Sequence, residues 1–443
     1  MKYHIITYGC QMNKSDSERI IEILERIKYQ PAQKIEEADL IIIVACSVRQ
    51  KAIDRIYGKL KKLQILKIQN PKLKIIITGC LLRYDKEKIV QNFSHVVDKV
   101  ISIQKIIQLP KILNQKIKFK QKSIKSYLDI YPKCSSKIEA YVPIMTGCNN
   151  YCAYCVVPYT RDKEISRSTD SILKEIKNLI KDGYKKITLL GQNVNSYSSI
   201  IKDIKKIKKI NFVRLLELIN NLSGNFWFTF ITNHPKDMSE ELIKKLPYLN
   251  KLCHYIHLPL QSGDNQILKK MNRNYSIKHY LSLIKKIRQS LPDVNISTDI
   301  IVGFPGETEK QFLNTKKLME KVKFDMAYIA CYSPRPQTLA YKMKDNLSSE
   351  EKKRRERILT EVLKKTALEN NQKYLNKIVK VLVEEKIKNN KLETSTYFGK
   401  TKTLKKVKIE TNQNILGKFV LVKITQASPW GLKGKLIRNN FTK

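Results

Sequence analysis

The chain has 443 residues, 42% of them hydrophobic and 28% charged, which suits a globular protein of two or three domains and excludes a disordered chain. Its longest apolar runs are far shorter than the roughly 20 residues of a membrane span. The first residues enter a strand-like pattern with no leader segment, so we expect a cytoplasmic protein without membrane association. The 85 Lys and Arg residues against 40 Asp and Glu residues give a net charge of +45, which favours a nucleic acid as partner. The alternative is a compositional drift that places lysines on solvated helix faces.

Residues 1–110 repeat the same unit three times: an apolar strand, a cysteine at its end, and a helical stretch. The strands and their cysteines are residues 3–8 with Cys10, 39–45 with Cys46, and 73–78 with Cys80. Strands that alternate with helices indicate a parallel α/β sheet, whose carboxyl strand ends line one edge and bind ligands there. We therefore predict that the three thiols form a metal site in this domain. The alternative for each of them is a buried core thiol.

Residues 111–137 are rich in lysine and lose clear periodicity, which is typical of a linker. This segment contains Cys134, which has no partner at ligand spacing, so we assign no role to it. Cys253 and Cys331 fall within or beside predicted strands further along the chain, and we expect them in the core.

Residues 138–372 contain six predicted strands separated by helical stretches. The strands are residues 138–145, 186–190, 226–231, 255–258, 295–302 and 325–330. Six such units fit an open, partial (β/α)6 barrel, and the active site of a parallel barrel lies at the carboxyl ends of its strands. Because Cys148 follows the first strand directly, we expect it in that site.

Residues 373–440 change period again and contain five short predicted strands with turns between them. The strands are residues 377–386, 394–399, 404–410, 418–425 and 432–438. This pattern predicts a small five-stranded β-barrel of the OB type, and its many lysines favour RNA binding. The alternative is a capping domain with a solvated basic face.

Cys148, Cys152 and Cys155 have the spacing CxxxCxxC. In a reducing cytosol such clustered thiols are metal ligands or catalytic groups rather than disulfides. A zinc site would ordinarily require a fourth Cys or His nearby, and the sequence has no histidine between His95 and His234. Three thiolates can instead hold an iron–sulfur cluster with one iron left open for a ligand that is not protein.

These motifs resemble those of the radical S-adenosylmethionine (SAM) methylthiotransferases, and among them the branch that modifies isopentenyladenosine in tRNA. The matching segments run through nearly the whole chain and are residues 7–13, 16–17, 45–49, 78–80, 147–161, 190–195, 257–263 and 298–308. Gln11, Met12 and Asn13 after Cys10 match this branch better than its sister branches. The carboxyl-terminal barrel resembles the family's RNA-binding TRAM domain.

The resemblance implies two 4Fe-4S clusters. The cluster on Cys148, Cys152 and Cys155 would bind SAM and cleave it to a 5′-deoxyadenosyl radical, which removes hydrogen from carbon 2 of an isopentenyl-bearing adenine beside the anticodon. The auxiliary cluster would offer a methylated sulfur to that carbon, and a second SAM would supply the methyl group. The resemblance gives the auxiliary cluster the ligands Cys10, Cys46 and Cys80. Because the clusters carry this chemistry, we assign no side chain as catalytic.

Two loops resemble the family's SAM contact loops, one at the end of the second barrel strand and one at the end of the fifth. The residues that the resemblance assigns to SAM are Gly191, Gln192 and Asn193, Gly303 in the loop 303–307, and Gln261, Ser262 and Asp299. The glycines would let the backbone approach the ligand closely. The alternative is that each glycine only forms a turn after its strand.

We expect a monomer that binds the isopentenyladenosine-containing anticodon loop of tRNA, because such a loop offers unstacked bases that can enter a cleft. An electron donor such as flavodoxin or ferredoxin would serve it. Within the same chemistry, the alternatives are methylthiolation of a ribosomal-protein aspartate or of threonylcarbamoyladenosine in tRNA. A different alternative is a non-catalytic iron–sulfur protein that binds RNA.

The sequence departs from the family pattern at four positions. Asp162 and Gln337 each stand where glycine is usual, Asn233 stands for a serine, and Lys400 stands for a frequent arginine. Lysine is a point charge rather than a bidentate donor, so we expect Lys400 to bind a phosphate less tightly than arginine would.

Overall fold

The computed structural model describes the chain except for residues 49, 116–125, 203–206, 388–393 and 438–443. Arg49 in the motif at 45–49, part of the predicted linker and the last residue of the predicted strand 432–438 therefore lie outside the described residues. In the described ranges, no helix is both long and apolar enough to cross a membrane.

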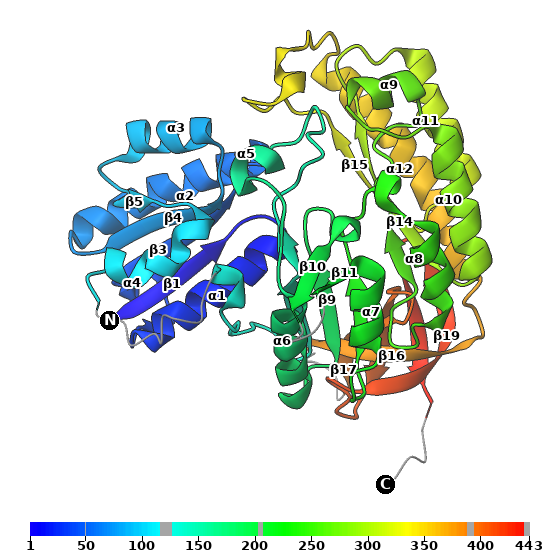
Figure 1. The fold of residues 1–443 in the computed structure, drawn as a ribbon, viewed down its shortest axis with the longest axis horizontal. Coiled ribbons are helices and arrows are strands. Elements are labelled where there is room, and N and C mark those ends of the chain that lie inside the picture. The colour runs from blue at the N-terminus through cyan, green and yellow to red at the C-terminus, as the bar shows by residue number, and fades with distance from the viewer. Residues whose placement is uncertain (49, 116–125, 203–206, 388–393, 438–443) are drawn as a thin grey trace.

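The amino-terminal part is a parallel five-stranded sheet with the strand order β2-β1-β3-β4-β5 (Figure 1). The strands are β1 (Lys2–Thr7), β2 (Gln30–Pro31), β3 (Leu40–Cys46), β4 (Lys74–Cys80) and β5 (Lys99–Val100), and the helices are α1 (Gln11–Arg26), α2 (Gln50–Gln69), α3 (Arg83–Phe93) and α4 (Leu109–Ile112). Every residue of β3 is buried, as expected for an apolar strand that is covered on both faces. The side chains of α1 pack on one face of the sheet, and those of α2 and α3 pack on the other.

The described part of the predicted linker packs against the amino-terminal sheet instead of forming a free tether. Tyr127, Leu128 and Ile130 are buried in the same core as the inner side of α1. A short 3-10 turn at Tyr127–Asp129 is capped by the side chain of Ser126. The segment therefore connects two parts of the chain while contributing apolar surface to the first of them, which its high lysine content concealed.

The central part is an open arc of six parallel strands. These are β6 (Glu139–Pro143), β9 (Lys186–Leu190), β12 (Trp227–Phe230), β13 (Tyr255–His257), β14 (Asn295–Val302) and β15 (Met326–Cys331). They form the two sheets β12-β9-β6 and β13-β14-β15, which an isolated parallel bridge between Phe228 and Leu252 joins. The predicted partial (β/α)6 barrel is therefore present, and each predicted strand overlaps an observed one.

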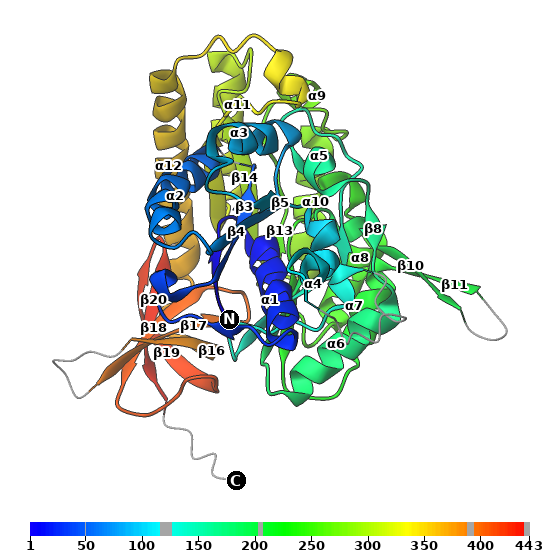
Figure 2. The same ribbon diagram turned by 90° about the vertical axis from the view of Figure 1, so that its left-hand side faces the viewer.

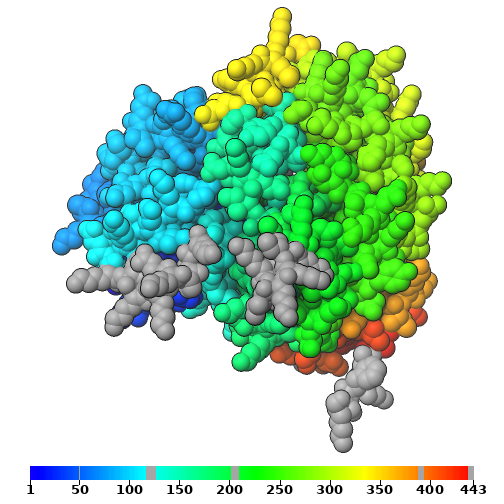
Figure 3. All heavy atoms as spheres, viewed as in Figure 1, coloured from blue at the N-terminus to red at the C-terminus, as the bar shows by residue number. Residues whose placement is uncertain are grey.

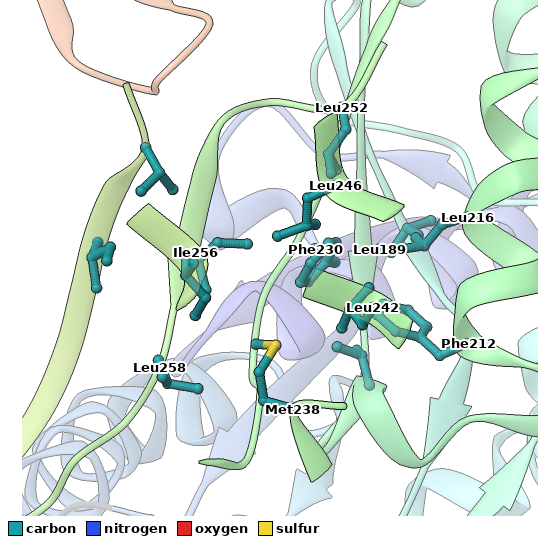
Figure 4. Packing of buried hydrophobic residues seen from close by; sticks show 14 of the residues in the cluster. Leu189, Phe212, Leu216, Phe230, Met238, Leu242, Leu246, Leu252, Ile256 and Leu258 are labelled. Atoms are coloured by element: carbon teal, nitrogen blue, oxygen red, sulfur yellow. The ribbon is translucent and has the colours of Figure 1, made fainter. Parts of the chain in front are cut away.

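Helices pack around the outside of this arc (Figure 1). They are α6 (Thr169–Lys181), α7 (Phe212–Asn220), α8 (Glu240–Lys245), α10 (Ile277–Ser290), α11 (Glu309–Val322) and α12 (Ser349–Gln372), with the short α5 (Val157–Arg161) and α9 (Asn265–Lys270) at the carboxyl edge. The core between strands and helices is mostly apolar, with a few buried hydroxyl side chains such as those of Thr229 and Ser297. Figure 4 shows part of it, where Phe230, Met238 and Ile256 lie among leucines from neighbouring elements.

Two small antiparallel pairs accompany the barrel. A hairpin of β10 (Ser198–Lys202) and β11 (Ile207–Asn211) follows β9 and projects from the body of the molecule (Figure 2). The pair β7 (Met145–Thr146) and β8 (Ile165–Ser166) encloses the CxxxCxxC loop. The sequence pattern did not indicate either pair.

The carboxyl-terminal part is a closed five-stranded barrel, as predicted, with the order β16-β17-β18-β20-β19. Its strands are β16 (Ile378–Ile387), β17 (Ser395–Thr401), β18 (Lys406–Thr411), β19 (Phe419–Ser428) and β20 (Gly431–Leu436). The backbone N–H of His254 donates to the carbonyl of Lys402 at 2.9 Å, and the Asn295 amide donates to the carbonyl of Thr403 at 2.8 Å. Since β13 and β14 begin at these positions, the small barrel covers the amino ends of the central strands and leaves their carboxyl ends open.

The amino-terminal and central parts pack directly against each other (Figure 3). Buried ion pairs cross between them: Arg19 Nη2 lies 2.7 Å from Glu175 Oε1, Arg335 Nη2 lies 2.6 Å from Asp85 Oδ2, and Arg161 pairs with Asp16. The carboxyl edge of the sheet is thereby fixed relative to the carboxyl edge of the barrel.

Candidate active site

The structure places Cys10, Cys46 and Cys80, which we call the sheet triad, at the carboxyl edge of the amino-terminal sheet. Cys46 and Cys80 end the neighbouring strands β3 and β4 and are register partners. Cys10 follows β1 and is the N-cap of α1. Cys46 and Cys80 are buried, whereas Cys10 is exposed. Three segments that are far apart in the sequence therefore present thiols at one edge.

Local contacts hold this edge together. The Asn13 side-chain amide donates to the carbonyls of Tyr8 at 2.8 Å and Ala45 at 2.7 Å, which ties the start of α1 to the end of β3. Gly79 directly precedes Cys80 and has a φ of 111°, and a Cβ there would lie 2.4 Å from the carbonyl oxygen of Ala45. Only glycine allows both this backbone conformation and this close approach.

The thiols of the sheet triad lie close enough to influence one another electrostatically. Burial raises the pKa of the Cys80 thiol to about 12; the Arg161 guanidinium opposes this shift, while Cys46, Asp16 and Cys10 add to it. Buried thiols at such a site are hard to ionise on their own. A bound metal cluster changes this balance because it takes thiolates as ligands.

Cys148, Cys152 and Cys155, which we call the loop triad, lie between β7 and α5 at the carboxyl edge of the barrel. The N–H of Cys148 donates to the carbonyl of Asp162 at 3.2 Å, and that of Cys155 donates to the carbonyl of Cys152 at 2.9 Å. Gly147 has a φ of 80°, and a Cβ there would lie 2.1 Å from the carbonyl oxygen of Lys163. Backbone contacts thus determine the path of this loop.

The loop triad is also anchored to the far side of the barrel. The N–H of Ala153 donates to the carbonyl of Met271 at 2.9 Å, and the carbonyl of Ala153 accepts from the N–H of Ala340 at 2.7 Å. Burial raises the pKa of Cys155 to about 12, with Cys152 and Cys148 adding to the shift. The three thiols of the loop triad therefore also lie near one another.

A cavity of about 210 Å³ connects the two edges. Its lining includes Cys155 of the loop triad, Gln261 and Asp299 from the barrel, and Val48, which follows Cys46 closely in the sequence. Two of the seven predicted SAM contacts thus line the same cavity as Cys155, whereas no cysteine of the sheet triad is part of its lining. Such a pocket between a sheet edge and a barrel edge suits a small ligand.

The remaining predicted SAM contacts are not part of the lining of this cavity. Among the described residues, the side-chain oxygens of Gln192 and Asn193 are buried and have no hydrogen-bond partner. Ser262 and Gly303 are buried, and the Gly303 N–H donates to Glu307 Oε2 at 2.7 Å. The unpaired amide oxygens fit a polar ligand, whereas the N–H of Gly303 already has a partner. Gly191 stands tightly against Met145.

Two arginines contact the triads, and sequence reasoning assigned neither of them a role. Arg161, at the end of α5, donates from Nε to Cys80 Sγ at 2.8 Å. Arg273 donates from Nη1 to Cys152 Sγ at 3.5 Å and from Nη2 to the carbonyl of Pro259 at 2.9 Å. The only feature of the sequence that pointed to either arginine is that Arg161 ends the segment 147–161, which matches the family pattern.

The four departures from the family pattern have structural counterparts. Asp162 and Gln337 have positive φ angles of 62° and 69°, which explains why glycine is usual there. The Asn233 amide donates to the carbonyl of His257 at 3.0 Å and so joins the ends of β12 and β13. Lys400 Nζ lies 3.4 Å from Glu384, so part of its charge is already compensated.

The cysteines of each triad suit an iron–sulfur cluster better than a single metal ion. In the described part of the chain, no three His, Cys, Asp or Glu side chains converge tightly enough to hold a single metal ion. A 4Fe-4S cluster binds each thiolate on a different iron, so its ligands stand further apart than those of one ion. The three thiols at each edge fit such a cluster.

Comparison with known families divides the chain into three matching segments. Residues 142–319 match the radical SAM superfamily, residues 2–102 match the Uncharacterized protein family UPF0004, and residues 372–437 match the TRAM domain. At the level of the fold, the chain is similar to the radical SAM methyltransferase TsrM from Kitasatospora setae, with a TM-score of 0.53 at 10% identity over 76% of this chain and 73% of that one. It is also similar to the cobalamin-dependent radical SAM enzyme OxsB, with a TM-score of 0.51 at 11% identity over 81% of this chain and 56% of that one.

Curated relatives cover nearly the whole chain. The tRNA-2-methylthio-N(6)-dimethylallyladenosine synthase of Dictyoglomus thermophilum is 42% identical over 99% of both chains. The enzymes of the same name from Clostridium tetani and Thermoanaerobacter sp. are 42% and 41% identical over 98% of this chain and over 96% and 92% of their own lengths. The chain therefore belongs to the tRNA-2-methylthio-N(6)-dimethylallyladenosine synthase family within the radical SAM superfamily, whose members use SAM and a 4Fe-4S cluster.

Proposed function

We propose that this chain methylthiolates carbon 2 of N6-isopentenyladenosine beside the anticodon of tRNA, using two 4Fe-4S clusters and SAM. The observation that carries the proposal is the placement of one cysteine triad at the carboxyl edge of the sheet and of another at the carboxyl edge of the barrel packed against it, in a chain of this family. An aromatic C–H bond has no acidic proton, so acid–base catalysis at neutral pH does not reach it and a cofactor must carry the step. When bound, the clusters and SAM supply hydrogen abstraction, sulfur and the methyl group.

The protein's own residues position and shield these groups. The loop triad would hold the cluster that binds SAM, and the sheet triad would hold the auxiliary cluster. Gln261 and Asp299 would contact SAM in the cavity, and the unpaired oxygens of Gln192 and Asn193 would accept hydrogen bonds from it. Gly191, Ser262 and Gly303 would shape the surrounding loops. The buried side chains between the two edges, such as Arg161 and Asp16, would help to shield the reacting groups from water.

The carboxyl-terminal barrel offers a surface for RNA. A groove of about 330 Å³ is lined by Phe398, Trp430 and three lysines, Lys406, Lys408 and Lys433. Trp430 is half exposed, and Lys406 Nζ lies 4.2 Å from the centre of the Phe398 ring. Aromatic faces between cations suit the stacked bases and phosphates of RNA. Because the barrel covers the amino ends of the central strands, this groove would hold a part of the tRNA away from the modified adenine.

The tRNA substrate implies action in the cytoplasm. The reductant would be a small electron carrier such as flavodoxin or ferredoxin, and the working unit would be a single chain.

The domain limits that we propose are 1–110, 138–372 and 373–440, with residues 111–137 between the first two. The family matches at 2–102, 142–319 and 372–437 support these limits.

Nucleoside mass spectrometry of tRNA from a deletion strain tests the proposal. The 2-methylthio mark should disappear and isopentenyladenosine should remain. The wild-type chain should restore the mark and the loop-triad triple alanine variant should not, whereas Cys253→Ala, at a buried cysteine outside both triads, should restore it. Persistence of the mark, together with loss of an aspartate modification on a ribosomal protein, would contradict the proposal.

A further inference from the structure

Arg161 links the helix that follows the loop triad to the sheet triad. It ends α5, the helix that directly follows Cys155, and this helix lies between the amino-terminal and central parts (Figure 1). Its side chain reaches the sheet edge, where Nε donates to Cys80 Sγ at 2.8 Å and Nη1 donates to the Tyr127 hydroxyl at 3.1 Å. The loop that carries one triad thus supplies a donor to the sulfur of the other.

The guanidinium is also paired with a carboxylate. Arg161 Nη2 forms a buried ion pair with Asp16, and the exposed fractions of the two side chains are 1% and 0%. A buried ion pair is weak evidence for a stabilising role, because desolvation offsets much of its attraction. Folding stability alone therefore does not account for a charged group whose hydrogen-bond acceptors include a cysteine sulfur.

A second arginine in the same region provides a contrast. Arg19 on α1 is equally buried and is paired with Glu175. Its described hydrogen bonds go to Ser15 and Glu175, and not to a cysteine. Arg19 therefore shows what a purely structural buried arginine looks like in this interface.

We propose that Arg161 is a positioning residue that sets the reduction potential of the auxiliary cluster through the Cys80 sulfur. The negative charge of Asp16 offsets part of this effect. The inference rests on the proposed auxiliary cluster. Hydrogen bonds to ligand sulfurs and nearby charges are among the factors that set cluster potentials. A positive donor favours the reduced, more negative cluster, and a carboxylate opposes it. The division of electrons between the two clusters is then governed by a residue from the loop that carries the other triad.

The test isolates the auxiliary cluster in the full-length chain. The parent is the variant Cys148→Ala/Cys152→Ala/Cys155→Ala, reconstituted without oxygen and checked for about four irons per chain. Arg161→Gln, Arg161→Lys, Asp16→Asn and the control Arg19→Gln are then introduced singly. The midpoint potential of the remaining cluster is measured by a redox titration that is followed by electron paramagnetic resonance.

The expected shifts have opposite signs. Arg161→Gln removes a positive donor and should lower the midpoint potential, and Arg161→Lys, which keeps the charge but not the Nε bond, should lower it less. Asp16→Asn removes a negative charge and should raise the potential. Arg19→Gln should match the parent.

Equal potentials in Arg161→Gln and Arg19→Gln, or shifts of the same sign in Arg161→Gln and Asp16→Asn, would overturn the inference while leaving the auxiliary cluster in place. If Arg161→Gln fails to hold iron, the signs of the shifts in midpoint potential in Arg161→Lys and Asp16→Asn decide whether the inference holds. Absence of iron from the parent would overturn the proposed auxiliary cluster and this inference with it.

Discussion

The two triads are held in place by different kinds of contact. The loop triad lies within residues 148–155, and backbone hydrogen bonds of its own loop hold it. The sheet triad is assembled from the ends of three strands, and its geometry depends on the register of β3 with β4 and on Asn13. A local motif thus carries its own geometry, whereas a dispersed site inherits its geometry from the whole domain.

The charges around the two triads differ as well. Arg161 beside Cys80 is compensated by Asp16, but the described hydrogen bonds of Arg273 beside Cys152 go to that sulfur, to the Pro259 carbonyl and to the Tyr275 hydroxyl. The loop triad therefore faces an arginine held by neutral groups, and the sheet triad faces a compensated pair. We expect the two sites to respond differently to the same kind of change.

Removing each triad in turn should give the largest difference. The triple alanine variant of the loop triad should lose both SAM cleavage and tRNA modification, because its cluster would bind SAM. The same variant of the sheet triad should keep cleavage and lose sulfur insertion. Assays of 5′-deoxyadenosine and of iron check this, with about eight irons in the wild type and about four in either variant. Equal loss of cleavage in both would contradict separate roles.

Alanine in place of Gly147, which precedes Cys148, or of Gly79, which precedes Cys80, should disrupt only the adjacent triad. Gly147→Ala and Gly79→Ala each place a Cβ against a carbonyl oxygen, at 2.1 and 2.4 Å, on a backbone with positive φ. Each should lower the free energy of unfolding by at least about 2 kcal/mol, and iron should be lost from the adjacent triad. Chemical denaturation and iron assays measure both effects.

Gly58 provides the control for these two variants, because it lies in α2 with no atom within 4 Å of its added Cβ. Gly58→Ala should raise stability by about 0.5–1 kcal/mol. A similar loss of iron in Gly58→Ala would show that the effect is not local to the triads.

Trp430→Ala should separate RNA binding from the chemistry of both triads. Loss of a stacking face should weaken tRNA binding by about 1–3 kcal/mol, while SAM cleavage without RNA stays unchanged. Tyr248→Ala removes an aromatic side chain that is 72% exposed and lies outside the groove, and it serves as the control. Filter-binding titrations at constant salt would show the difference, and equal weakening in the two variants would exclude the groove.

His234 allows a test of the uncompensated charge near the loop triad. Burial, and then Arg273 and Lys236, lower the pKa of His234 to about 2, and its Nδ1 accepts from the Lys236 N–H at 3.3 Å. The unfolded chain takes up a proton below about pH 6.5 and the folded chain does not. Stability should therefore fall as the pH drops below that value, by up to about 1.4 kcal/mol per pH unit.

The variant His234→Asn should remove this part of the pH dependence, as measured by urea denaturation between pH 8 and pH 5.5. His279→Asn, at an exposed position of α10, should leave the slope unchanged. An unchanged slope in His234→Asn would mean that other groups cause the acid sensitivity.

The sequence predicted those features that depend on local pattern. The apolar run of β3, the six central strands and the closed terminal barrel each follow from hydrophobic period and turns. The CxxxCxxC spacing is local, and the sheet triad could be predicted because two of its cysteines end strands of the same parallel sheet and the third closely follows another strand of it.

Other features depend on contacts that no local pattern encodes. Arg161 and Arg273 are two among 85 basic residues, and only packing distinguishes a buried arginine from an exposed one. The hairpin of β10 and β11 forms through pairing of the segments with each other, and its sequence, in which isoleucine recurs at every third residue from 201 to 210, also suits a helix face. Tyr127 and Leu128 were concealed by the lysines around them.

Asp162→Gly should give the smallest change, an increase in stability. Asp162 has a φ of 62° and a ψ of −163°, a conformation that is essentially restricted to glycine, and its carbonyl accepts from the Cys148 N–H at 3.2 Å. Relief of this strain, less the entropy of an added glycine, should raise the free energy of unfolding by about 1 kcal/mol. Asp162→Ala keeps a Cβ and should give no gain, so an equal gain in both would assign the effect to the lost carboxylate. Because the strain lies in the loop of one triad, iron retention should improve at the loop triad and not at the sheet triad.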